Sequence, residues 1–196
     1  MKHQPLLMLL LSAVFYYGCA TPRGSTIAEK REYIHQMKTD TLEELFEKRP
    51  ESKSKMDQAV GYGVFSNIGS ALLISGAGNG FGVVINKESG EETFMRMFKA
   101  TAGLGVGIKD FRTVMLFYDP QVLQNFVRKG WEFGSQADLA AKLGDTGGSE
   151  AVSGTLNRSM DIYQFTENGI FLRLALEGTK YWPDKKLNAR IVEEQD

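Results

Sequence analysis

Apolar side chains recur at helical spacing in the chain after residue 25, with charged residues between them. Thr26 and Glu29 have the spacing of a capping box, in which a hydroxyl and a carboxylate satisfy free amides at a helix start. A second start signal, Asp40 followed by Glu43, stands before another apolar stripe. We therefore expect three short helices, over residues 26–38, 40–50 and 53–59, each with a solvated charged face.

From Gly61 the pattern changes to short runs rich in β-branched and aromatic residues, punctuated by glycine. Turn-forming residues at 86–91 separate two of these runs and predict a hairpin. The expected strands cover residues 61–65, 71–74, 81–85, 93–98, 102–108 and 113–118, with a turn at 109–112.

One helix is expected after these strands. Asp119 followed by Pro120 is a typical helix start, and Gly130 stands where such a helix would end. The remaining expectations are a hairpin over residues 160–165 and 170–176, a Gly/Ser-rich loop at 145–155 and a short terminal helix capped by Asp184; residues 133–143 fit a helix or a strand equally.

Glycine occupies alternate positions in two segments, 76–82 and 103–107. A dinucleotide-binding loop is a poor match, because its third glycine falls on Phe81 in the first segment and on Ile108 in the second. In a strand, this alternation leaves one face without side chains, which permits sharp curvature and close packing or gives room for an acyl chain. The sequence therefore predicts an α+β fold, with N-terminal helices followed by a strongly curved, mostly antiparallel glycine-rich β-sheet with one inserted helix.

The amino terminus has the layout of a secretory signal. Lys2 precedes an apolar segment, residues 5–15, which is shorter than the roughly 20 residues that span a bilayer. Gly18 and Cys19 resemble the lipobox of bacterial lipoproteins, although tyrosines stand where that box usually begins. The expected division is a signal peptide at 1–18, a lipidated tether at 19–25 and a lipid-binding domain at 26–196; an ordinary signal with an incidental cysteine is the alternative.

Charge and composition exclude several classes of function. The chain has 23 Lys and Arg residues against 24 Asp and Glu residues, whereas nucleic-acid binders usually show a basic excess. After signal cleavage His35 is the remaining histidine, and acylation would leave no free thiol. The usual zinc sites, Ser-His triads and Cys-His pairs are therefore excluded, and no acidic cluster has calcium-loop spacing. We expect no catalytic residues, no metal and no cofactor.

Five stretches keep a recognisable order along nearly the whole mature chain: residues 59–65 (AVGYGVF), 78–84 (GNGFGVV), 103–112 (GLGVGIKDFR), 162–166 (IYQFT) and 176–182 (LEGTKYW), the last followed by Asp184 and Asn188. Together they resemble the SYLF family, also called the Ysc84-type lipid-binding domain, in its bacterial lipoprotein form. Ser66 departs from the proline usual in eukaryotic members. The resemblance implies binding to phospholipid membranes and no catalytic residues; phosphoinositides and actin are partners of eukaryotic members.

Binding to anionic lipid needs basic groups beside aromatic or apolar ones. Two segments combine these: Lys109, Phe111 and Arg112 at the expected turn, and Lys180, Tyr181, Trp182, Lys185 and Lys186 near the end of the chain. The alternative for Tyr181 and Trp182 is that they are core residues that close the sheet. The N-terminal helices are a third candidate surface.

The leading functional hypothesis is a non-enzymatic, membrane-anchored module that binds phospholipid, with anionic lipid as the expected partner. Ala20 after the cysteine favours the periplasmic side of the bacterial outer membrane over the inner membrane. One alternative is an envelope structural or interaction lipoprotein with no lipid affinity beyond its acyl anchor and an unidentified protein partner. A carboxylate hydrolase using Glu91, Glu92 or Asp161 is a third, although nothing in their spacing singles them out.

Overall fold

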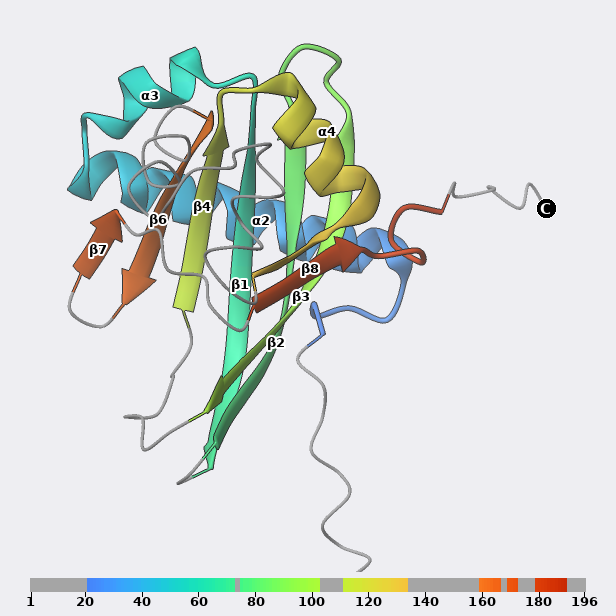
Figure 1. Cartoon of the computed structure of the whole chain (residues 1–196). Coiled ribbons are helices and arrows are strands. Elements are labelled where there is room, and N and C mark those ends of the chain that lie inside the picture. The colour runs from blue at the N-terminus through green and yellow to red at the C-terminus, as the bar shows by residue number, and fades with distance from the viewer. Residues whose placement is uncertain are drawn as a thin grey trace, which may run out of the picture.

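The computed structural model describes residues 21–72, 75–102, 111–133, 159–166, 169–172 and 179–189. Within them, helices lie on both faces of one antiparallel sheet, with α2 behind the strands and α4 in front (Figure 1). The predicted α+β class and the curved antiparallel sheet with one inserted helix are thus confirmed. The expectations for the signal peptide, Cys19, Lys109, the strand at 103–108, and residues 134–155 lie outside the described residues.

A single long helix, α2 (Ile27–Lys48), takes the place of the first two predicted helices. The capping box is present, because the Glu29 backbone N–H donates to Thr26 Oγ1 at 3.1 Å and Glu29 Oε2 accepts from the Thr26 N–H at 3.1 Å. The predicted break near residue 40 is wrong. Asp40 Oδ1 accepts from Gln36 Nε2 at 2.7 Å, so the carboxylate predicted to cap a new helix is satisfied inside α2, and Thr41 Oγ1 donates to the Met37 carbonyl at 2.7 Å. The helix α3 (Ser52–Gln58) matches the third prediction.

The described strands form one sheet in the order β5-β8-β3-β2-β1-β4-β6-β7, and all neighbouring pairs are antiparallel. Their bounds are β1 (Gly61–Leu72), β2 (Ser75–Asn86), β3 (Glu92–Ala102), β4 (Phe111–Phe117), β5 (Trp131–Phe133), β6 (Met160–Thr166), β7 (Gly169–Leu172) and β8 (Thr179–Pro183).

Two strand predictions need correction. Residues 71 and 72 do not begin a separate strand, because β1 runs on to Leu72; residues 73 and 74 lie outside the described ranges. Phe111 and Arg112 do not form a turn but begin β4, where they pair with Asn67 and Ser66 of β1. The hairpins at 86–91 and 166–169 are confirmed, as is α4 (Pro120–Lys129) with its Asp119 cap and with Gly130, at φ 68°, as its end.

The sheet buries different side chains on its two faces. On the α4 face, Phe126 packs against Phe65 and Trp131, with ring centroids 6.0 and 5.5 Å apart. On the α2 face, Leu45 packs in a buried cluster with Val64 and other strand residues. Burial of both faces accounts for the long apolar runs in the central strands.

The alternating glycines of β2 are positions of close packing. A Cβ on Gly82 would lie 2.2 Å from the Val64 carbonyl oxygen, and one on Gly80 would lie 2.5 Å from Cγ of Met97. The bare positions at Gly78, Gly80 and Gly82 lie against Asn67, Met97 and Phe65 respectively. The close-packing interpretation therefore holds for this strand, since protein side chains fill the space that an acyl chain would need.

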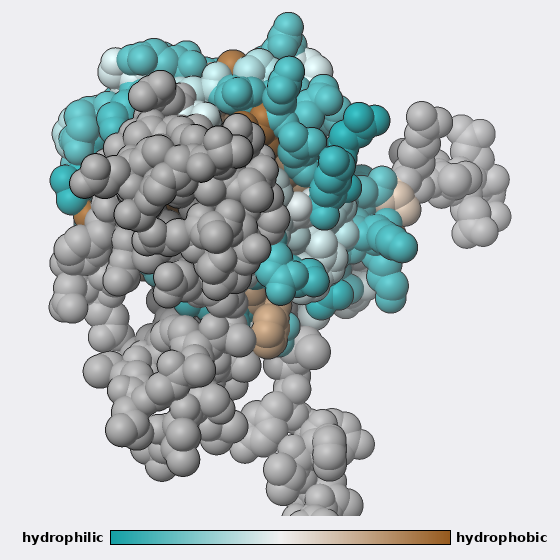
Figure 2. Space-filling view, in the orientation of Figure 1, coloured by the Kyte–Doolittle hydropathy of each residue, from teal (hydrophilic) through white to brown (hydrophobic). Residues whose placement is uncertain are grey.

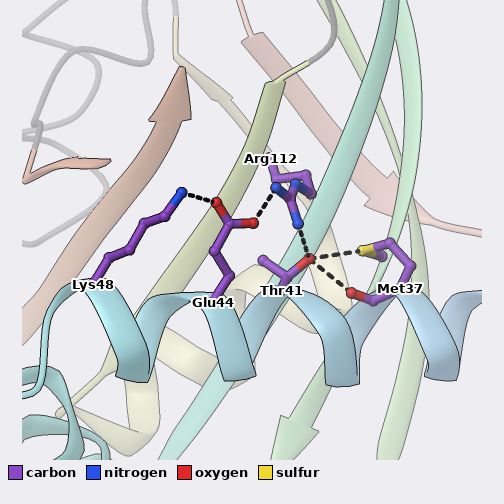
Figure 3. Close-up of polar contacts among 5 residues, drawn as sticks. All are labelled: Met37, Thr41, Glu44, Lys48 and Arg112. Atoms are coloured by element: carbon purple, nitrogen blue, oxygen red, sulfur yellow. Dashed lines mark hydrogen bonds and ion pairs between the residues drawn. The ribbon is translucent and has the colours of Figure 1, made fainter. Parts of the chain in front are cut away.

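An ion-pair network fastens α2 to β4 (Figure 3). The Arg112 guanidinium pairs with the Glu44 carboxylate and lies 3.4 Å from Thr41 Oγ1, while Lys48 Nζ donates to Glu44 at 2.6 Å. The hydrogen bond from Lys48, together with the Arg112 contact, lowers the pKa of the Glu44 carboxyl below its ordinary 4.5. Arg112 also lies 4.9 Å from the ring centroid of Phe165, so its guanidinium is engaged in holding the fold together.

We expect Gly82→Ala to lower the free energy of unfolding by about 1–3 kcal/mol, because the added methyl meets backbone that cannot move away cheaply. Asn79→Ala, at a partly exposed position of the same strand, should change it by less than about 0.5 kcal/mol. Urea denaturation of both variants measures the difference, and equal midpoints would contradict the packing argument.

We expect Glu44→Gln to cost about 1 kcal/mol of unfolding free energy at neutral pH. A carboxyl whose pKa is lowered in the folded state contributes stability above its unfolded pKa and loses it as the pH falls through the folded value. The difference between wild type and variant should therefore shrink below pH 4.5. Denaturation at neutral and acidic pH tests this, with the exposed Glu47→Gln as the control that should show little effect at either pH.

Candidate functional site

A groove of about 640 Å³ opens where the first described residues, Thr21 and Pro22, meet the sheet. Its walls come from the first turn of α2, the middle of β2 and β3, the end of β8 and the turn after β8. The segments that meet here are distant in the sequence, so register and packing create the groove.

The groove has an apolar floor. Phe81 and Leu187 are 2% and 4% exposed and belong to one buried cluster, while Trp182 and Pro183 are half-buried beside them. Ile27, at 38% exposed, is one of the two large apolar side chains that the described residues leave open to solvent. An exposed apolar surface of this kind, bordered by charge, is typical of a binding site.

Four basic side chains line the same groove: Lys30 of α2, Arg96 of β3, and Lys185 and Lys186 of the turn after β8. Arg96 lies 3.9 Å from Asp184, the one acidic lining residue. Among the described residues, none of the ion pairs involves Lys30, Lys185 or Lys186. The groove therefore carries a net positive charge above an apolar floor.

Sheet register places the central residues of the groove in one row. Arg96 pairs with Phe81 on one side and with Trp182 on the other. Paired residues of neighbouring strands project from the same face of a sheet, so these three side chains lie side by side on the α2 face. This row gives the groove an apolar ring at each side of a guanidinium.

The turn after β8 is held firmly against the fold. Asp184 Oδ1 accepts from the Lys186 and Leu187 N–H groups at 2.9 and 3.1 Å, and therefore caps a tight turn where a short helix was predicted. The Asn188 amide exchanges two hydrogen bonds with the backbone of Phe94, at 2.8 and 2.7 Å. Arg31 of α2 donates to the carbonyls of Leu187 and Ala189 at 2.9 and 2.7 Å.

Three of the predicted site residues meet in the groove: Trp182, Lys185 and Lys186. Tyr181 does not, because it points to the opposite face of β8, where it is 1% exposed and its ring centroid lies 4.8 Å from that of Phe65. The core interpretation is therefore correct for Tyr181, and burial raises the pKa of its phenol far above the ordinary value. Lys180 is exposed and pairs with Glu132 at 3.1 Å.

The described residues of the second predicted segment, Phe111 and Arg112, do not line the groove. Arg112 lies in β4 and pairs with α2, and Phe111 precedes it in the same strand. The expectation that Arg112 stands in a turn is wrong, because it lies in β4, where its guanidinium pairs with Glu44 of α2.

Sequence reasoning missed Ile27, Lys30, Phe81 and Arg96 as site residues. Lys30 and Ile27 follow the capping box closely, so the predicted helix start was the available signal for them. Phe81 and Arg96 become neighbours only through strand register, which a single sequence does not specify.

Two of the three acidic residues considered for hydrolysis, Glu92 and Asp161, have polar partners in the structure. Glu92 lies 2.9 Å from His35 Nε2, and Asp161 accepts from Lys55 Nζ at 2.7 Å and from the Tyr118 hydroxyl at 2.9 Å. The hydrogen bond to Asp161 raises the pKa of the Lys55 ammonium, and burial raises that of the Tyr118 phenol. Within the described ranges, no three His, Cys, Asp or Glu side chains group as metal ligands would.

Each helix in the described part of the chain is too short or too polar to cross a bilayer.

Comparison with known proteins gives two matches. Residues 98–196 match the family Ysc84, described as "Las17-binding protein actin regulator". The chain is also 36% identical over 164 residues to "Beta cell expansion factor A" of Aeromonas veronii, an alignment that covers 83% of this chain and 60% of that protein. The chain thus spans about 60% of the length of this relative. The family match contains β8 and the turn that forms one wall of the groove, and it confirms the resemblance seen in the sequence: this chain belongs to the Ysc84 (SYLF) family.

Proposed function

We propose that this chain is a membrane-anchored, non-enzymatic phospholipid-binding module of the bacterial cell envelope, in which the groove takes anionic lipid. The observation that carries the proposal is the groove itself, where an apolar floor lies beneath four basic side chains. Anionic lipid presents the complementary pattern, a negatively charged headgroup joined to apolar chains.

The position of the groove supports membrane contact. Thr21 and Pro22 line it, and Thr21 follows Cys19 by two residues. Even fully extended, two residues span about 7 Å, so an acylated Cys19 would hold the groove next to the bilayer surface. With Ala20 in the second position, we propose that this surface is the periplasmic side of the outer membrane.

The family supports a binding role in general terms. The family description names a regulator that binds another protein. The resemblance of the sequence to the SYLF family implies affinity for lipid. Several acyl chains on a lipoprotein cysteine suffice for anchoring, so affinity in the groove would serve a purpose other than attachment.

The test uses the mature chain with Cys19→Ser, which has no acyl anchor. We expect it to sediment with vesicles of phosphatidylcholine and phosphatidylglycerol, more weakly at high salt, and to leave pure phosphatidylcholine vesicles largely unbound. Replacing Lys30, Lys185 and Lys186 together with glutamine should weaken binding about a hundredfold, since each basic residue near an anionic surface contributes about 1 kcal/mol.

A matched control removes the same charge from elsewhere. Lys53, Arg128 and Lys129 are exposed residues outside the groove, and their joint replacement with glutamine should weaken binding far less. Equal loss in the two triple variants would contradict the groove as the site. If the Cys19→Ser chain with its lysines intact fails to bind any vesicle at any salt concentration, the lipid-binding proposal fails and the interaction lipoprotein is the better account.

A further inference from the structure

Strands β1, β2 and β3 have two ends of opposite character. At one end the connection from β2 to β3 carries Lys87, Glu88 and Glu91, and the described surface there, over α3 and α4, is mostly hydrophilic (Figure 2). Towards the other end no charged residue occurs between Ser66 and Asn86, a stretch that includes most of β1 and nearly all of β2. In β3, Lys99 is the last charged residue before the strand ends at Ala102.

This uncharged end extends past the neighbouring elements that the structure describes. Figure 1 shows β1, β2 and β3 continuing beyond α2, α4, β4 and β6. We call residues 68–72, 75–77 and 100–102 the strand tip. A strand rises about 3.3 Å per residue, so the five residues after Asn67 carry β1 about 17 Å further, to Leu72. This length exceeds the roughly 6 Å depth of a headgroup layer.

The sequence that joins β1 to β2 at the tip is unusual for a loop in water. Two-residue hairpin connections favour Asn-Gly, Asp-Gly or similar polar pairs, whereas this one reads Leu73-Ile74 between Leu72 and Ser75. The turn between β2 and β3, at the opposite end of the same strands, has the expected polar residues.

Backbone pairing continues to the end of the strand tip. Leu72 pairs with Ser75, and Ser75 pairs with Ala102, so β2 has a partner on both sides. A segment that enters lipid must satisfy its peptide groups internally, and β2 meets this condition. Among the described residues, β1 pairs with β4 as far as Asn67, and β3 pairs with β8 as far as Lys99.

The side chain of Phe98, at the base of the tip, is apolar and open to solvent. Phe98 is 37% exposed and, with Ile27 in the groove, completes the pair of large apolar side chains that are exposed in the described residues. Phe98 pairs with Asn79 of β2 and with Lys180 of β8, and Asn79 in turn pairs with Ile68 of β1. Aromatic side chains at this position fit the boundary between headgroups and acyl chains.

We infer that the strand tip inserts into the interfacial region of a lipid bilayer, next to the headgroups bound in the groove. The inference rests on the proposed membrane function and adds a second, apolar contact to it. The groove and the tip share strand β2: Gly80 and Phe81 line the groove, and Ser75 lies five residues nearer the end. A headgroup in the groove would therefore place the tip deeper in the same leaflet.

The test attaches the mature chain to vesicles by a polyhistidine tag in place of Cys19 and a nickel-chelating lipid, so attachment does not depend on the groove. The chain has a single native cysteine, so Leu72→Cys then carries an environment-sensitive fluorophore as the only label. We expect its emission to shift to shorter wavelength on vesicles, with quenching by nitroxide-labelled acyl chains and shielding from aqueous iodide. The same label at Ser89→Cys, in the turn at the opposite end, should keep its aqueous emission.

A second measurement uses the untagged Cys19→Ser chain. Leu72→Asp should weaken its binding to anionic vesicles about tenfold, because an aspartate is far costlier in lipid than a leucine, while its thermal unfolding stays that of the parent. Aqueous emission from the label at residue 72 on the attached chain would overturn the inference, as would unchanged binding of Leu72→Asp. An emission shift that depends on the surface density of the attached protein and not on the lipid would also overturn the inference, because it would indicate contact between copies of the chain. The groove is judged separately, by the lysine variants, so either proposal can fail while the other stands.

Discussion

The close approach of side chains to the glycine positions of β2 is the constraint on which the rest of the structure depends. Phe65, Asn67 and Met97 occupy the space that side chains at positions 82, 78 and 80 would need. This packing lets the central strands curl around α4, and the buried ring of Tyr181 in β8 completes that core. Its neighbour Trp182 then projects from the other face, where the first turn of α2 and the turn after β8 form the groove around it. The chemistry of the groove thus follows from packing on the opposite side of the sheet.

Local signals in the sequence predicted the parts of the fold that depend on local chemistry. The capping box at Thr26, the Asp119-Pro120 helix start and the glycine that ends α4 all act over a few residues. The predicted break at Asp40 failed because the same residue types that cap a helix are also satisfied inside one: Thr41 bonds back to Met37, and Asp40 accepts from Gln36 at 2.7 Å. Tertiary contact with β4, through Arg112, then favours the continuous helix.

The residues of the candidate site that are close in sequence could be predicted, whereas those brought together by tertiary structure could not. Trp182, Lys185 and Lys186 stand close together in the sequence, so composition indicated them. Arg96 and Phe81 join them by cross-strand register, and Lys30 by the path of α2 across the sheet. Because side chains alternate along β8, Tyr181 and Trp182 must project from opposite faces of the sheet. Which of the two faces the α4 core depends on the register of β8 with β3. A single sequence shows that the side chains of a strand alternate between two faces, but it does not show which set faces the core.

The hydrogen bonds of Asn188 have a consequence for association between copies of the chain. Strand β8 pairs with β3 from Met95 to Lys99, and just past that ladder the Asn188 side-chain amide takes both the N–H and the C=O of Phe94. One amide thereby stands in for the next residue of a neighbouring strand. Exposed strand edges are templates for pairing with another chain, and the anchoring proposed above would raise the local concentration of copies. The side chain that fixes the wall of the groove therefore also closes this stretch of β3 to edge-to-edge association.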